Sequence, residues 1–136
     1  MGRILAIDYG MRRIGLALSD PLKIIATPLE TLVINSYEDG IKKLLALFND
    51  HDLEKIIMGY PIGTSGNKTE QTLLVEKLIK ELKTSISTPI IIWDERYTSL
   101  QAKSIMQEQG IKTKNNKEMV DQLSARIMLQ EYLNTI

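Results

Sequence analysis

The stretch ILAIDYGMRRIGLAL, residues 4–18, decides the fold because it holds two short apolar runs with a turn between them. Ile4–Ile7 and Ile14–Leu18 have the length and composition of strands, and the segment between them, Tyr9–Arg13, contains a glycine. Two such runs with a short glycine-containing connection are typical of a β-hairpin. Asp8 ends the first run, so a carboxylate directly follows a strand of buried type.

The rest of the chain predicts three more strands, with helices between and after them. Residues 24–34 are apolar and partly β-branched, and Pro28 within them predicts an edge strand or a bulge. Ser36 and Asp39 resemble a capping box that begins a helix reaching about Asp50. The later elements are expected as strand 55–59, helix 74–82, strand 89–93, helix 99–109 and helix 117–133. This order predicts an α/β fold, with a mixed five-stranded sheet flanked by helices.

Composition limits the possible functions. The 136 residues are 43% apolar, which suits one domain over 1–136. The 17 Lys and Arg balance the 17 Asp and Glu, so any surface that binds a polyanion must be a local patch. The absence of cysteine excludes disulfides, thiolate catalysis and cysteine-based zinc sites.

The apolar runs also bear on location. None approaches the ~20 residues that span a bilayer, and the N-terminus reaches Asp8 before an apolar signal core forms. We therefore expect a cytoplasmic protein with no membrane partner.

The single histidine, His51, lies near a predicted helix end beside Asp52, which favours a solvated side chain. Histidine-based metal sites and Ser-His nucleophile systems therefore have too few ligands and bases. Polar chemistry in this chain must come from Asp, Glu, Lys, Arg, Ser, Thr or Tyr.

Three acidic positions are candidates for a site. Asp8 and the pair Asp94-Glu95 each follow a buried-type strand, at the end where ligands gather in α/β sheets. Alternation along a strand puts Asp94 and Glu95 on opposite sides, and we take Glu95 as the inward group with Asp94 as the alternative. Asp121 lies about one turn into the last helix, where small residues three and four positions later permit close approach to a sheet. Each acid alone has an ordinary explanation: an Asx turn, a surface ion pair or a favourable helix dipole.

Two nucleotide-binding patterns do not hold. The segment 63–69 follows a strand and precedes a helix, but its Gly-Lys-Thr is broken by Asn67, so we interpret it as a loop with a helix cap. The Asp8-Tyr9-Gly10 turn with Gly15 is similar to the phosphate hairpin of the actin and sugar-kinase superfamily, whose nucleotide site needs a second lobe.

Five motifs together resemble the YqgF/RuvX family, ordered and spaced along nearly the whole chain as in that family. They are ILAIDYG (4–10), RIGLA (13–17), IMGYP (57–61), DERYTS (94–99) and VDQLSA (120–125). The resemblance implies an RNase H-like fold, related to the Holliday-junction resolvases, and a nuclease associated with maturation of the 5′ end of precursor 16S ribosomal RNA. It implies acidic active-site positions at Asp8, Glu95 and Asp121. Many related nucleases have an acid after the fourth strand, where this chain has Gly59-Tyr60-Pro61, so Glu95 must reach the site from the neighbouring strand.

Grouped carboxylates suit Mg²⁺ or Mn²⁺, and such ions activate water and stabilise the leaving oxygen in phosphodiester hydrolysis. Candidate contacts to the nucleic-acid backbone, each of which could also be ordinary surface, are Arg12, Arg13, Lys23, Arg96, Lys112, Lys114 and Lys117.

The expected partner is precursor ribosomal RNA or branched DNA, and the sequence leaves this choice and the oligomeric state open. Two other functions remain as alternatives. A nucleic-acid scaffold that does not cut is disfavoured by the presence of all three acids, and an ATP-dependent phosphotransferase by the missing lobe.

Overall fold

The five strands form one mixed sheet in the order β3-β2-β1-β4-β5. The computed structural model describes residues 2–63, 65–94, 108 and 117–136, with the backbone alone at 117–119 and 121. Its elements are β1 (Arg3–Tyr9), β2 (Arg13–Ser19), β3 (Ala26–Val33), α1 (Tyr37–Asn49), β4 (Leu53–Tyr60), α2 (Glu70–Ser85), β5 (Ile90–Asp94) and α4 (Lys117–Leu133). The mixed α/β sheet is thereby confirmed, whereas the helix expected at 99–109 lies outside the described residues apart from Glu108.

The predicted hairpin is confirmed: β1 and β2 pair antiparallel, with Asp8 opposite Gly15. The Gly10 amide donates to the Arg13 carbonyl at 2.9 Å, which closes the turn. A Cβ at Gly10 would lie 2.6 Å from that same oxygen, so the turn requires glycine. On the other side of β2, β3 is an edge strand with a register shift between Ile14 and Leu16, as Pro28 predicted.

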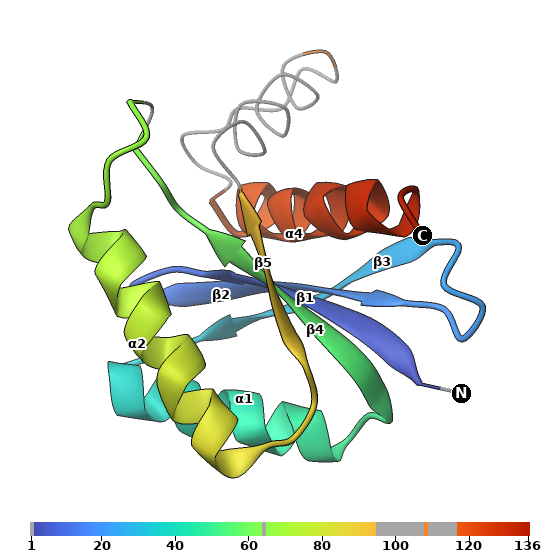
Figure 1. Ribbon diagram of the computed structural model, residues 1–136, viewed down its shortest axis with the longest axis horizontal. Helices are drawn as coiled ribbons and strands as arrows, with labels where there is room; N and C mark the ends of the chain where they lie inside the picture. The colour runs from blue at the N-terminus through green and yellow to red at the C-terminus, as the bar shows by residue number, and fades with distance from the viewer. Residues whose placement is uncertain (1, 64, 95–107, 109–116) are drawn as a thin grey trace.

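The remaining pairs, β1 with β4 and β4 with β5, are parallel. Helices α1 and α2 lie on one face of the sheet and α4 on the other (Figure 1). Two apolar cores follow from this layering. On β1, Leu5 and Ile7 belong to the core on the α1/α2 side, whereas Ile4 and Ala6 belong to the core under α4. This alternation fixes which side chains can meet at the ends of the strands.

Helix starts follow the local chemistry of the sequence. The Ser36 hydroxyl accepts from the Asp39 amide at 3.0 Å, and the Asp39 carboxylate accepts from the Asn35 amide at 2.9 Å. The cap expected at Ser36 is therefore confirmed, although the return bond reaches Asn35. Thr69 caps α2 in the same manner, with Thr72 as its partner. Within the described part of the chain, no helix has the length and apolar character needed to cross a membrane.

Candidate active site

Asp8 is half-buried near the end of β1, at the end of the sheet where β1, β4 and β5 finish, here called the carboxyl end of the sheet. Ile4 and Ala6 pack under α4, so Asp8, two residues further, lies on the α4 face. Opposite it on β2 is Gly15, and on β4 Gly59 follows the last residue paired with β1, Met58.

Both glycines lie on the same face as Asp8. Gly15 is two residues before Ala17, and Gly59 is two residues after Ile57, and these two neighbours belong to the core under α4. Gly15 and Gly59 therefore add no side chain on this face, whereas Arg13, two residues before Gly15, lies on the same face of β2. Both glycines are buried.

Alternation along β5 separates the two candidate acids after that strand. Ile91 and Trp93 pack against the core under α4, so Asp94 lies on the opposite face, towards α2, where it is exposed. Asp94 is thus on the face away from Asp8. Glu95 lies outside the described residues.

Helix α4 runs antiparallel to β1. Near its C-terminal end, the Tyr132 hydroxyl accepts from Lys55 Nζ at 2.8 Å, and Lys55 pairs with Ile4 at the start of β1. The amide of Gln130 exchanges hydrogen bonds with Ala26 N at 3.0 Å and the Ile24 carbonyl at 2.9 Å, which fixes the same end of the helix.

The length of α4 carries its first turns to the carboxyl end of the sheet. Residue 121 precedes Tyr132 by about 16 Å of helix rise, while Asp8 follows Ile4 by about 13 Å of strand. The small residues after position 121 are buried as predicted, Ser124 being 3% and Ala125 0% exposed. The backbone of Asp121 thus belongs to the part of α4 over the Asp8 end of the sheet, and its side chain lies outside the description.

The other predicted contacts are described only in part. Arg12 is exposed at the hairpin tip and Arg13 is half-buried at the start of β2. Outside the described side chains are Arg96, Lys112, Lys114 and Lys117. Among the side chains that are described, which exclude Glu95 and Asp121, no three acids or histidines lie close enough to hold a metal ion.

The loop before α2 uses its own backbone groups. The Gly63 amide donates to the Asn67 carbonyl at 2.9 Å, and the Gly66 amide donates to the Gly63 carbonyl at 2.8 Å. Gly66 has a φ of 85°, which favours glycine. Two amides that a phosphate-binding loop would offer are therefore occupied, in agreement with a loop and helix cap.

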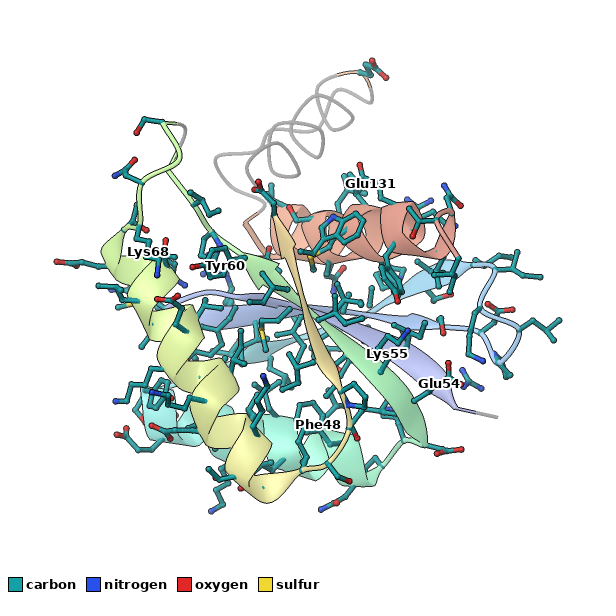
Figure 2. The ribbon with its side chains drawn as sticks, in the orientation of Figure 1. Phe48, Glu54, Lys55, Tyr60, Lys68 and Glu131 are labelled. Carbon is teal, nitrogen blue, oxygen red and sulfur yellow. The ribbon has the colours of Figure 1, made fainter. Side chains whose placement is uncertain are left out.

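A polar cluster at the same end of the sheet was missed by sequence reasoning. Tyr60 and Lys68, which are labelled in Figure 2, both donate to Oε2 of Glu76, each at 2.9 Å. The Lys68 hydrogen bond, and then that of Tyr60, lower the pKa of Glu76, while the pKa of Lys68 is raised. No motif joins positions so far apart in sequence, so only the packing of α2 on β4 brings them together.

A family model described as RuvX, Holliday junction resolvase, matches residues 2–135. The chain belongs to the RuvX family. It is 38% identical over 134 residues to a candidate pre-16S rRNA nuclease of Dictyoglomus turgidum, covering 98% of this chain and 95% of the relative. A candidate pre-16S rRNA nuclease of Ruminiclostridium cellulolyticum is 40% identical over 135 residues, with 98% and 95% covered.

Solved structures show where this RuvX chain stands among folds. Thermus thermophilus RuvC in complex with a Holliday junction substrate matches with a TM-score of 0.62 and 11% identity, covering 99% of this chain and 95% of that one. The Fowlpox virus resolvase bound to Holliday junction DNA matches with a TM-score of 0.61 and 10% identity, covering 98% and 97%. These likenesses confirm the RNase H-like fold that the resemblance implied.

Proposed function

We propose that this RuvX protein is a metal-dependent endonuclease that hydrolyses phosphodiester bonds, with precursor 16S ribosomal RNA as its substrate and branched DNA as the alternative. The observation that carries the proposal is the half-buried carboxylate of Asp8 at the carboxyl end of the sheet, with a glycine on each neighbouring strand. Carboxylate oxygens at the carboxyl end of the strands, where ligands of α/β sheets gather, are the donors that hard divalent cations prefer. The named relatives, at 38–40% identity, support nuclease activity and the ribosomal substrate.

Asp8, Glu95 and Asp121 are the proposed catalytic and metal-binding residues. The direction of α4 supports Asp121, because the first turns of this helix reach the end of the sheet that carries Asp8. The alternation of β5 supports Glu95 over Asp94, because Asp94 lies on the opposite face from Asp8. Arg12 and Arg13, on the turn that follows Asp8, are proposed to hold the nucleic-acid backbone.

The donor chemistry of the site fits Mg²⁺ or Mn²⁺, which prefer carboxylate oxygens and retain waters. When bound, such an ion supplies an activated water and neutralises charge on the leaving oxygen. Asp8 would contribute a half-buried oxygen donor at the carboxyl end of the sheet. The chain has no histidine at this end, so no imidazole is available there as the general base. A cytoplasmic location, beside ribosomal RNA, fits the proposal.

The decisive experiment compares wild type with Asp8→Asn on labelled precursor ribosomal RNA and on a four-way junction, with Mg²⁺, Mn²⁺ or chelator. We expect cleavage only with metal, its loss by at least about 100-fold in Asp8→Asn, and little change in binding, because basic groups hold the polyanion. Asp52→Asn is the matched control, since Asp52 is an exposed acid just before β4, at the other end of the sheet, and should cleave normally. Equal cleavage by wild type and Asp8→Asn would refute the site. Binding without cleavage of either substrate would favour the scaffold function.

A further inference from the structure

Met11 at the tip of the β1–β2 hairpin is 71% exposed, the highest value among the exposed large hydrophobic side chains of the described residues. It follows Asp8 by three residues, so the two Cα atoms are at most about 10 Å apart. The Met11 side chain is exposed, so it takes no part in the core and is available for contact with a partner.

The hairpin tip is held from three directions. Within the turn, the Gly10 amide donates to the Arg13 carbonyl at 2.9 Å, and from the end of β3 the Ile34 amide donates to the Arg12 carbonyl at 2.9 Å. From α2, the Gln71 side-chain amide donates to the Tyr9 carbonyl at 2.6 Å. Met11 is therefore presented on a backbone that is fixed to β3 and α2, which lowers the entropy cost of using it as a contact.

A cleft of about 410 Å³ lies between this tip and the first turns of α2, lined by Met11, Glu70, Gln71 and Leu74. Its volume falls within the ~300–1,000 Å³ range of small-molecule sites. The walls given by Met11 and Leu74 are apolar, while Gln71 and Glu70 bring polar groups. A flat ring with apolar faces and hydrogen-bonding edges matches this lining, and a nucleobase is such a ring.

We propose that this cleft receives a nucleobase unstacked from the substrate, with Met11 as the apolar wedge that holds it out. Methionine is among the side chains that separate stacked bases, and sulfur makes favourable contacts with aromatic rings. Arg12 and Arg13 directly follow Met11 in the sequence, so the positive charge that attracts the phosphates adjoins the apolar wedge. The substrate class is thus a strand with an unpaired base within a few nucleotides of the cleaved phosphate. This inference rests on the proposed function, because it assumes that the substrate phosphate lies at Asp8.

The test places the fluorescent base 2-aminopurine in a one-nucleotide bulge of an RNA duplex, and it uses Asp8→Asn so that no strand is cut. Binding should raise the fluorescence of the bulged base, because the base leaves the stack. Adding Met11→Ala should remove most of this rise and weaken binding of the bulged strand about 2- to 10-fold. Leu22→Ala is the matched control, since Leu22 is 67% exposed on the β2–β3 turn at the other end of the sheet. It should change neither quantity, and a fully paired duplex should not distinguish Met11→Ala from its parent.

Three results would overturn the inference. The first is an unchanged 2-aminopurine signal on binding, and the second is an equal effect of Met11→Ala and Leu22→Ala. The third is a change in the oligomeric mass of the protein without nucleic acid on Met11→Ala, which would make the cleft a contact between protein chains. The fluorescence assay needs no cleavage, so failure of the nuclease proposal leaves its readout intact. Conversely, if wild type cleaves its substrate but Met11→Ala changes neither the 2-aminopurine signal nor binding, only the base cleft is rejected.

Discussion

Tyr60, the last residue of β4, donates its phenolic hydrogen to the Glu76 carboxylate of α2 at 2.9 Å. Lys68 contacts the same carboxylate oxygen at 2.9 Å, so one helical residue holds both the end of a strand and the loop that follows it. The loop lies at the carboxyl end of the sheet, where we place the substrate. Its position therefore depends on the charge of Glu76.

Because the loop depends on the charge of Glu76, we predict that the stability contributed by this residue changes with pH. Hydrogen bonds from Lys68 and Tyr60 lower the pKa of Glu76 in the folded protein below its unfolded value of ~4.3. The carboxylate therefore stabilises the fold at pH values above ~4.3, and this contribution is lost as the pH falls through the lower, folded pKa. Glu76→Gln should lower Tm at pH 7, and its difference from wild type should vanish in strong acid. Thermal melts from pH 7 to pH 2 measure this, with exposed Glu30→Gln as the control, and a difference that persisted at the acid end would contradict the prediction.

The second prediction concerns the packing around Gly40 in α1. A Cβ at this position would lie 3.3 Å from Tyr9 Oη and 3.3 Å from Ile34 Cδ1, so larger side chains must displace both. Gly40→Val should lower the free energy of unfolding by about 1–3 kcal/mol. Ala46→Val, at an exposed position of the same helix, introduces the same β-branched side chain and should cost less than about 0.7 kcal/mol. Urea denaturation measures both, and equal losses would mean that the contact with Tyr9 does not limit this position.

The choice between the two acids after β5 is open to direct measurement. Because Asp94 lies on the face away from Asp8, Asp94→Asn should retain cleavage within about threefold of wild type. Glu95→Gln should lower kcat by at least about 100-fold if this residue is the second acid. Single-turnover cleavage with metal in excess separates the two variants. The reverse order of activities would make Asp94 the second acid.

Metal binding should appear in stability as well as in activity. Carboxylates that share a site repel one another until a cation neutralises them, so Mn²⁺ at about 100 times its Kd should add about 2.7 kcal/mol to the free energy of unfolding. Asp8→Asn combined with Asp121→Asn should abolish this gain. Asp50→Asn combined with Asp52→Asn changes the net charge equally at exposed positions and should keep it. If the double variant in the proposed site kept the full gain, the ion would bind elsewhere.

The sequence predicts what local patterns determine. The β1–β2 hairpin, the cap at Ser36 and the edge position of β3 follow from alternation, side-chain oxygens and Pro28, and each is confirmed. The same alternation assigned Asp94 and Glu95 to opposite sides, which the packing of Trp93 supports for Asp94.

What escaped prediction depends on contacts between distant segments. Nothing in the spacing of Tyr60, Lys68 and Glu76 indicates that they meet, because the packing of α2 on β4 brings them together. From the sequence alone, Gly40 only lowers the helix propensity of its segment. Its close packing against Tyr9 is visible only in the structure. The roles of Glu95 and Asp121 remain predictions.

Gly15 and Gly59 adjoin Asp8 on β2 and β4 and bring no side chain to its face of the sheet, so the size of the residue at these positions sets how full that face is. A methyl group at position 59 would add volume near Asp8 while every proposed ligand stays in place. Reaction rate could in this way be reduced in steps, independently of metal affinity, by changing only the size of one uncharged residue. A substitution at position 59 therefore offers a route to a slow variant that holds its intact substrate long enough to be observed.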